Sequence, residues 1–217
     1  MKTNRMELVF ILDRSGSMCG LEADTIGGYN ALLEKQKKEA GEARVTTVLF
    51  DDRCEVLHDR IEIDGLAPIT DREYYVRGST ALLDAVGTTI QKIMNAQRYT
   101  APDKRADKVL FVITTDGYEN ASREYDYARV KSMIEKQKEK YGWEFLFLGA
   151  NIDAAATAGR FGIAPERAVN YHADSEGTRL NYEVVSEAVS QMRCDMPLAA
   201  NWKSRIESDY QSRKAKR

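Results

Sequence analysis

The sequence predicts an α/β domain in which helices cover both faces of a mostly parallel, doubly wound sheet. Short apolar runs, typical of strands buried on both faces, alternate along the chain with longer segments whose apolar residues recur at helical spacing. One pair of strand-like runs is separated only by Asp51-Asp52-Arg53, and so short a connection forces the two strands to pair antiparallel. The predicted sheet is therefore mixed, with one antiparallel strand at its edge.

The first half of the chain contributes three strands and two helices to this prediction. The apolar run 8–12 predicts a buried strand, and 45–50 and 54–61 form the two strands of the hairpin. Helices are expected over about 21–40 and 81–98, because apolar residues recur there at intervals of three and four. The residues expected on the inner faces of these helices are Ile26, Tyr29, Leu33, Leu83, Val86, Ile90 and Met94.

The second half of the chain continues the alternation of strands and helices. Buried strands are expected at 109–113, 143–148 and 168–171. A helix face is marked by Tyr127, Val130, Ile134 and Tyr141, and Asp153 is expected to cap a short helix that ends near Gly159. A last helix is expected from about residue 177 to Arg193, and Pro197 stops it.

Composition bounds the class of protein. With 217 residues, 43% hydrophobic residues and a formal net charge of −2, the chain can bury a sizeable core and does not have the charge of a nucleic-acid binder. We expect one domain over 1–195 and a basic C-terminal extension over 196–217 that is solvated and frayed. The sequence has no run long enough to span a membrane and no signal-peptide pattern. Three scattered cysteines without a Cys-x-x-Cys motif predict buried or half-buried thiols and a cytoplasmic location.

The most informative stretch follows the first strand and reads Asp13-Arg14-Ser15-Gly16-Ser17. Oxygen-bearing side chains stand at alternate positions, and Gly16 permits a sharp turn and a close approach by a ligand. Converging oxygens suit a hard cation, magnesium above all. The alternative is that Asp13 or Ser17 is only the N-cap of the next helix, but one cap needs one oxygen and here three are present. The pattern therefore favours a cation site.

Two further segments are expected to reach the same site. Thr80 precedes its own helix, and Asp116 ends the strand that follows that helix. In doubly wound sheets ligands bind beyond the carboxyl ends of the strands, where the strand order reverses. We expect the strands ending in Asp13 and Asp116 to flank that point. Taken alone, Thr80 could be an N-cap and Asp116-Gly117 a turn; beside the Asp13 motif, both are predicted to be ligands.

These three segments together resemble the metal ion-dependent adhesion site of the von Willebrand factor type A domain. The resemblance rests on Asp13-x-Ser15-x-Ser17, Gly78-Ser79-Thr80 and Thr115-Asp116-Gly117, and it covers roughly residues 7–193. The loops are most similar to those of small stand-alone intracellular bacterial members. One departure is that Ser79 stands where the family often has a second glycine. The resemblance implies a Rossmann-like fold.

The resemblance also implies a role for each residue. Ser15 and Ser17 would bind the metal directly, Thr80 directly or through water, and Asp13 and Asp116 mainly through bound water. Magnesium is the expected ion, with Mn²⁺ or Ca²⁺ as substitutes. Neutral hydroxyl ligands leave much of the positive charge on the ion, which then takes an anionic oxygen. That oxygen would come from an Asp or Glu carboxylate of a partner protein, and an ATPase-type protein is one partner the family suggests.

The chain is therefore expected to be an interaction module and not an enzyme. A Mg²⁺-dependent phosphate-ester hydrolase on the same fold remains open, although no histidine is placed as a base and Ser15 stands where a second Asp would be needed. A nucleotide-binding domain also remains open, although the chain has neither a G-x-G-x-x-G nor a G-x-x-x-x-G-K-[ST] motif. Neither a membrane nor a nucleic acid is expected as a partner.

Residues around the site are assigned secondary roles. Thr114 and Thr115 are expected either to support the site by hydrogen bonding or only to end a strand, and Asp51 and Asp52 are interpreted as a hairpin turn. His58 and His172 show no ligand spacing. Residues suggested for the rim of the binding face are Tyr75, Arg77, Tyr118 and Asn120.

Overall fold

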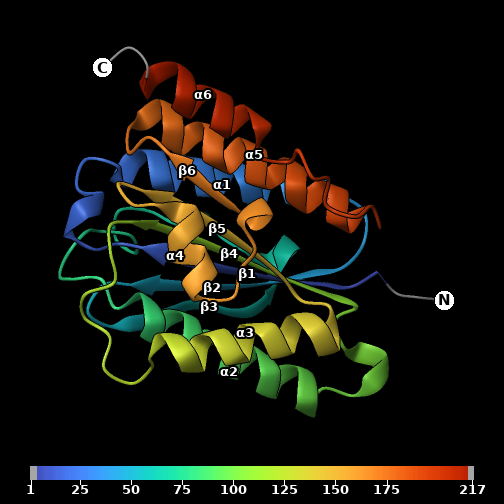
Figure 1. The fold of residues 1–217 in the computed structure, drawn as a ribbon. Coiled ribbons are helices and arrows are strands. Elements are labelled where there is room, and N and C mark those ends of the chain that lie inside the picture. The colour runs from blue at the N-terminus through green and yellow to red at the C-terminus, as the bar shows by residue number, and fades with distance from the viewer. Residues whose placement is uncertain (1–3, 215–217) are drawn as a thin grey trace.

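A six-stranded sheet forms the centre of the molecule. The computed structural model describes residues 4–214. The strand order is β3-β2-β1-β4-β5-β6, and every neighbouring pair is parallel except β2 and β3 (Figure 1). The strands are β1 (Met6–Asp13), β2 (Ala43–Phe50), β3 (Cys54–Glu62), β4 (Lys108–Asp116), β5 (Glu144–Ala150) and β6 (Ala168–Tyr171). The predicted mixed sheet with an antiparallel edge strand is confirmed.

The order of the strands reverses between β1 and β4. The chain moves from β1 to β2 and β3 on one side, then returns to pair β4 with the other edge of β1. All eight residues of β1 are buried, as expected for a central strand covered on both faces. The register aligns Leu12 with Thr114, so Asp13 and Asp116 end adjacent strands at the same edge of the sheet. The predicted switch point is confirmed.

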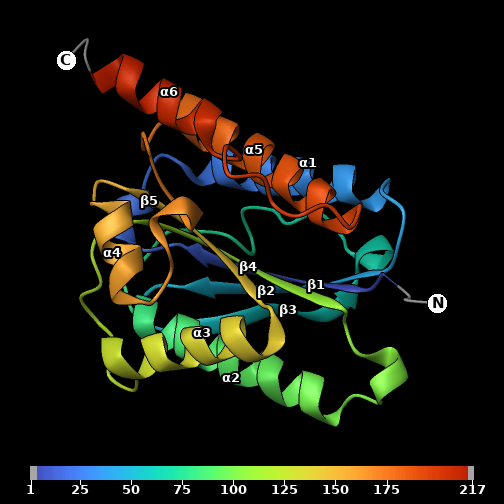
Figure 2. The same cartoon turned by 45° about the vertical axis from the view of Figure 1, so that its right-hand side comes forward.

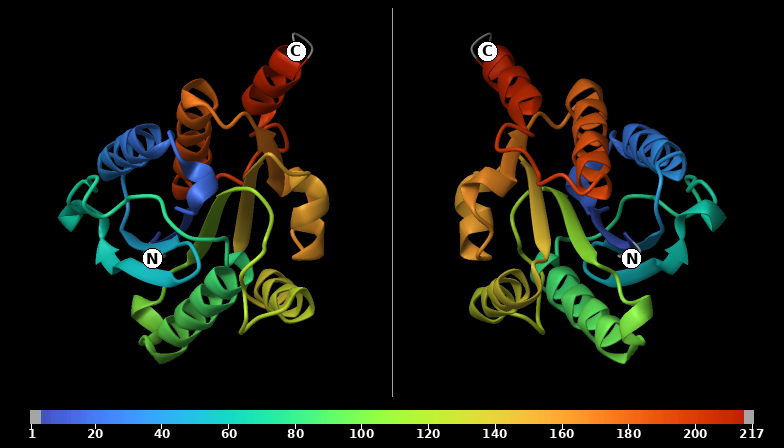
Figure 3. Two further views of the ribbon diagram at one scale, coloured as in Figure 1. Left: turned by 90° about the vertical axis from the view of Figure 1, so that its left-hand side faces the viewer. Right: turned by 90° about the vertical axis from the view of Figure 1, so that its right-hand side faces the viewer.

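Helices cover both faces of the sheet. The helices α1 (Glu22–Lys37) and α5 (Ser175–Arg193) lie side by side on one face, where Tyr29, Leu33 and Val185 join one apolar cluster (Figures 1 and 3). The helices α2 (Leu82–Tyr99) and α3 (Tyr127–Tyr141) lie together on the other, and the short α4 (Ala154–Arg160) shares their cluster (Figure 2). Each helix thus buries an apolar stripe against the sheet.

The predicted elements are all present, and most inward residues are where the pattern placed them. Asp153 caps α4 by accepting a hydrogen bond from the Ala156 backbone N–H at 2.9 Å. Tyr141 differs, because it stands in the last turn of α3 and is 55% exposed. The cysteines also differ, because Cys19, Cys54 and Cys194 are exposed and not buried. Each of the three lies in a loop or at an edge, where strand and helix patterning gives no information on burial.

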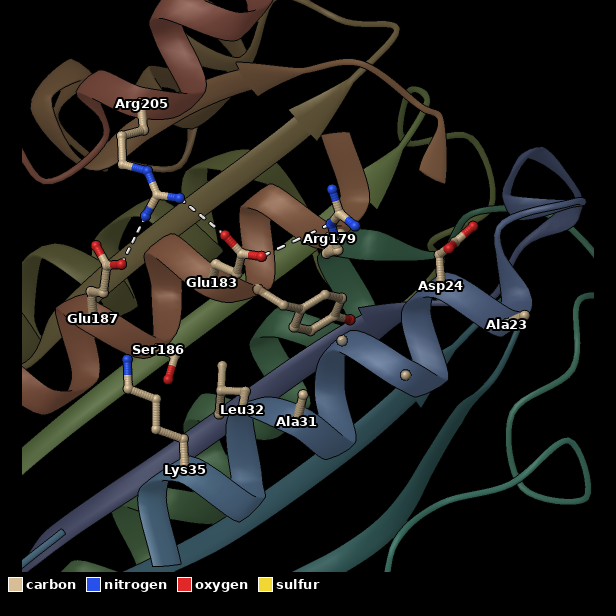
Figure 4. Close-up of a pocket in the computed structure, with 13 residues that line it drawn as sticks. Ala23, Asp24, Ala31, Leu32, Lys35, Arg179, Glu183, Ser186, Glu187 and Arg205 are labelled. Atoms are coloured by element: carbon tan, nitrogen blue, oxygen red, sulfur yellow. Dashed lines mark hydrogen bonds and ion pairs between the residues drawn. The ribbon is translucent and has the colours of Figure 1, made fainter. Parts of the chain in front are cut away.

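The C-terminal segment is an ordered, packed helix and not a frayed end. The helix α6 (Ser204–Lys214) lies against α5 and β6, and Ile206 and the preceding Trp202 are buried. Its basic residues have partners within the chain: Arg205 pairs with Glu183 and Glu187 of α5 at 3.0 and 2.7 Å (Figure 4). Sequence pattern missed this because the helix buries few apolar side chains. The division of the chain at residue 195 stays a prediction.

A groove of about 510 Å³ lies between α1 and α5. Figure 4 shows the residues that line it. The residues of α1 that line the groove are mostly small, which leaves space between the two helices. Tyr182 of α5 packs on Gly28, where an added Cβ would lie 2.3 Å from the tyrosine ring. In the described part of the chain, no helix is both long enough and apolar enough to cross a membrane.

The packing of α6 gives a prediction about stability. Ile206→Ala should lower the free energy of unfolding by about 2–3 kcal/mol, because it removes a buried side chain and leaves a cavity. Urea denaturation followed by circular dichroism measures this. Gln211→Ala, an exposed position on the same helix, is the control and should change the free energy by less than about 0.5 kcal/mol. Equal, small effects for both variants would mean that α6 does not dock stably.

Candidate metal centre

The five residues predicted as ligands come from three loops at the carboxyl edge of the sheet, the left-hand end in Figure 1. Asp13 is the last residue of β1, and Ser15 and Ser17 follow it. Thr80 lies two residues before α2, and Asp116 is the last residue of β4. Asp13, Ser15, Thr80 and Asp116 are buried, whereas Ser17 is exposed.

Direct contacts join the three loops. The Gly16 backbone N–H donates to the Gly78 carbonyl at 3.1 Å, which ties the first loop to the loop of Thr80. The Ser17 hydroxyl donates to the backbone carbonyl of Asp116, which ties the first loop to the end of β4. The structure therefore brings the predicted residues together on one edge, as the switch point of the sheet requires.

Asp13 is held by hydrogen bonds to both of its carboxylate oxygens. Its Oδ1 accepts from the Ser15 backbone N–H at 2.7 Å. Its Oδ2 accepts from the Thr115 hydroxyl at 2.7 Å and from the Asp116 N–H at 3.2 Å. Burial raises the pKa of Asp13 above its ordinary value, and the hydrogen bonds from Ser15 and Thr115 oppose that rise. Asp13 thus joins the ends of β1 and β4, and the predicted supporting role of Thr115 is confirmed.

The hydroxyl groups present oxygens that are not used for capping. Ser15 and Ser17 have their Oγ atoms 3.0 Å apart. Within the described residues, no hydrogen bond uses the Thr80 hydroxyl, although the residue is only 4% exposed. Its backbone is fixed instead, because the Thr80 N–H donates to Asn120 Oδ1 at 2.9 Å and its carbonyl accepts from the Asn120 N–H at 3.0 Å.

The alternative in which these residues are helix caps is not supported. The N-cap of α1 is Leu21, well past the Asp13 motif, and the N-cap of α2 is Ala81, one residue after Thr80. Neither N-cap residue makes a side-chain hydrogen bond to its helix. The oxygens of Ser17 and Thr80 therefore have no capping duty that would explain their positions.

Asp116 is the second buried acid of the site. Its Oδ1 accepts from the Asn151 side-chain amide at 2.5 Å, and Gly117 donates its N–H to the Ala150 carbonyl at 3.2 Å. Burial raises the pKa of Asp116, and the hydrogen bond from Asn151 opposes the rise. Sequence reasoning missed Asn151, which follows β5 in the way that Asp116 ends β4.

The donor set fits a hard divalent cation. The three loops carry three hydroxyls and two carboxylates at one edge of the sheet, and oxygen ligands of this kind suit Mg²⁺, Mn²⁺ or Ca²⁺ better than soft metals. Among residues 4–214, no three His, Cys, Asp or Glu side chains gather closely enough to hold a metal ion. A cation at this edge would therefore depend on the hydroxyl oxygens and not on a cluster of acids.

Comparison with models of protein families and with curated proteins gives no match. Solved structures do match: proximal thread matrix protein 1 of the mussel byssus gives a TM-score of 0.56 at 16% identity, over 88% of this chain and 46% of that one. A von Willebrand factor type A protein from Catenulispora acidiphila gives a TM-score of 0.57 at 12% identity, over 86% of this chain and 42% of that one. The ArnB paralog VWA2 from Sulfolobus acidocaldarius gives a TM-score of 0.53 at 15% identity, over 86% of this chain and 45% of that one. The chain has the von Willebrand factor type A fold.

The type A fold accounts for most of this chain but for less than half of each of those three proteins. A further structure of the mussel protein has a zinc-occupied MIDAS motif. At identities between 12% and 16%, these matches establish the fold.

Behind the candidate ligands lies a buried ionic network that sequence reasoning missed. Asp51, interpreted as a turn residue, does form the turn, because its Oδ1 accepts from the Arg53 N–H at 2.9 Å. Its Oδ2 also accepts from Arg14 Nε at 2.8 Å and from Arg77 Nε at 2.7 Å. Its carbonyl accepts from the Ala81 N–H at 2.7 Å. Asp51 therefore connects the end of β2 to two of the three site loops.

The charges of this network are largely removed from water. The Arg14 and Asp51 side chains are both 0% exposed. Burial acts to raise the pKa of Asp51, but hydrogen bonds from Arg77 and Arg14 are among those that bring it below its ordinary value. Arg14 also donates from Nη2 to Glu55 at 2.7 Å, on the solvent side. The signal was present in the sequence, since Asp51 follows a buried strand as Asp13 does.

The residues suggested for the rim divide into two groups. Tyr75 and Tyr118 are 42% and 62% exposed, as a contact surface requires. Arg77 and Asn120 instead support the site from within, through Asp51 and Thr80 respectively. His58 lies 3.0 Å from the Thr47 hydroxyl and His172 lies 3.1 Å from the Tyr210 carbonyl oxygen, so neither histidine belongs to the three loops.

The buried network gives a prediction with a matched control. Asp51→Asn should lower the free energy of unfolding by about 3 kcal/mol, because it leaves the buried Arg14 guanidinium without its counter-charge. Glu55→Gln removes the other partner of Arg14, whose side chain is 51% exposed, and should cost less than about 1 kcal/mol. Chemical denaturation of both variants gives the comparison. A loss for Glu55→Gln as large as that for Asp51→Asn would contradict this account.

Proposed function

We propose that this chain is a metal-dependent protein-interaction module. In this proposal Mg²⁺ binds among Asp13, Ser15, Ser17, Thr80 and Asp116, and a carboxylate from an Asp or Glu of a partner protein completes its coordination. The observation that carries the proposal is that the three loops bearing these hydroxyls and acids lie at the switch point of the sheet. The zinc-occupied MIDAS motif of the mussel protein, which has a similar fold, supports a divalent cation at such an edge.

The hydrogen bonds of the site favour the hydroxyls as direct ligands. Both carboxylate oxygens of Asp13 already accept hydrogen bonds from the chain, so Asp13 is suited to orienting waters and hydroxyls around an ion. One carboxylate oxygen of Asp116, Oδ1, accepts a hydrogen bond from Asn151. An ion held by neutral Ser15, Ser17 and Thr80 oxygens retains its attraction for an external anion. This distribution of charge favours capture of a partner's carboxylate.

The role proposed for this site is non-enzymatic. Hydrolysis of a phosphate ester needs a nucleophile or base beside the metal. His58 lies against the Thr47 hydroxyl, and His172, which lines a cleft with Tyr118 and Asn151, lies against the Tyr210 carbonyl oxygen. A nucleotide bound at this edge would lack the glycine-rich phosphate loop. The exposed rings of Tyr75 and Tyr118 beside the site suit a protein surface. We propose a cytoplasmic protein partner, with ATPase-type proteins among the candidates.

Metal binding is tested by changing one hydroxyl. Thr80→Ala should weaken binding of Mg²⁺ or Mn²⁺ about tenfold, because a ligand is lost, whereas Thr80→Ser keeps the oxygen and should bind within about twofold of wild type. Titration with Mn²⁺ followed by electron paramagnetic resonance measures the affinity. Because a bound ion stabilises the folded state, Mg²⁺ should also raise the melting temperature of wild type more than that of Thr80→Ala. Equal metal affinity in all three proteins would place any ion elsewhere.

Partner binding is tested with the purified chain as bait in lysate of the source cell. Proteins retained in Mg²⁺, but lost in chelator and with Asp116→Ala, are the expected result. Asp116→Ala should leave the fold intact because Asp116 is the last residue of β4 and belongs to neither apolar cluster of the core, and circular dichroism checks this. Glu139→Ala, which removes an exposed acid near the end of α3 and outside the three loops, is the control and should retain the partner. If partners are retained equally in chelator and with Asp116→Ala, they bind to another surface.

A further inference from the structure

A second cleft lies at the opposite end of the sheet from the candidate metal centre. It is bounded by the C-terminal halves of α2 and α3, which lie side by side in Figures 1 and 2. Ala106, which precedes β4, and Trp143, which precedes β5, place it where these strands begin. Its volume of about 470 Å³ is in the range of sites for small molecules. The proposed function does not use this cleft.

The charge of the cleft is positive. Arg98, Arg105 and Lys136 line it, and none of its lining residues is acidic. Arg105 is fixed by donating to the carbonyls of Thr100 at 2.8 Å and Arg98 at 3.2 Å, at the end of α2. Within residues 4–214, Arg98 and Lys136 form no ion pair. Cationic side chains near the C-terminus of a helix also stabilise it by interacting with the helix dipole. That role does not explain why these cations line a cleft.

A buried donor without a partner also lines the cleft. Gln137 is only 1% exposed, and its Nε2 has no hydrogen-bond partner among the described residues. A buried amide N–H costs free energy unless an acceptor meets it, and a ligand in the cleft that carries an acceptor would satisfy it once the Gln137 side chain turns toward the cleft. Aromatic rings stand nearby: Trp143 is buried and stacks on Phe111 at 5.6 Å, whereas Tyr141 is 55% exposed.

From these observations we infer that the cleft binds a nucleoside phosphate. The phosphates lie against Arg98, Arg105 and Lys136, which offer charge-assisted hydrogen bonds. The base lies against the Tyr141 ring and accepts a hydrogen bond from Gln137 Nε2 after that side chain turns toward the cleft. A ligand with both an anionic end and a flat, acceptor-bearing ring uses each of these features, and a simple anion uses only the cations. The site is at the amino edge of the sheet and needs no glycine-rich loop.

Isothermal titration calorimetry of the full chain with ADP tests this inference. The titration is run in chelator, so that the candidate metal centre does not contribute. Saturable binding of ADP is expected, with pyrophosphate and adenosine each at least about tenfold weaker because each makes only part of the contacts. Arg98→Ala and Lys136→Ala should each weaken ADP binding about tenfold through loss of a charge-assisted contact. Gln137→Met, which keeps the side-chain volume, should weaken it by a similar factor.

The control is Lys131→Ala, which removes a cation from the same helix outside the cleft and should leave ADP binding unchanged. Circular dichroism verifies that each variant is folded. Absence of ADP binding would overturn the inference, and so would pyrophosphate binding as tight as that of ADP, which would mean a general anion site. Binding of ADP that is unaffected by Arg98→Ala and Lys136→Ala would place the nucleotide elsewhere and would also overturn it.

Discussion

The candidate metal centre depends on the buried carboxylate of Asp51. This group receives Arg14 from the first loop and Arg77 from the loop of Thr80, at 2.8 and 2.7 Å. Without it, two cationic side chains from different loops would face each other behind the site. Because Arg14 and Asp51 are wholly buried, their attraction is weakly screened, and the geometry of both loops is fixed by it. The oxygens presented to a ligand are thus positioned by charges that no ligand touches.

The parallel sheet provides the second constraint. Since β1 and β4 are adjacent and parallel, their last residues must lie at one edge, and Asp13 completes the junction by accepting from Thr115 and Asp116. The segment from Ser15 to Ser17 and the loop of Thr80 add hydroxyl oxygens beside this junction. The rigid ends of β1 and β4 thus hold the polar loops in which a ligand would bind.

Sequence reasoning recovered the features that follow from periodicity and strand ends. The strands, the antiparallel edge and the meeting of Asp13 with Asp116 follow from apolar runs and from the rules of parallel sheets. It could not recover features set by side-chain packing across the fold. Arg14 stands in a loop and gives no sign of being buried, and α6 shows too weak an apolar stripe to be distinguished from a solvated end. Asp51 was assigned its local role as a turn residue, and its longer-range role depends on where two other loops lie.

The helix α2 links the two ends of the molecule. It begins two residues after Thr80, beside the candidate metal centre, and its last turn carries Arg98 into the second cleft. With 18 residues it spans about 27 Å at the usual rise per residue. Buried residues along its length, including Val86 and Ile90, hold it against the sheet. A helix packed in this way acts as a spacer, and energetic coupling between two sites needs an element with two arrangements. Because α2 is buried against the sheet along its length, binding at one end of the sheet is expected to be independent of binding at the other.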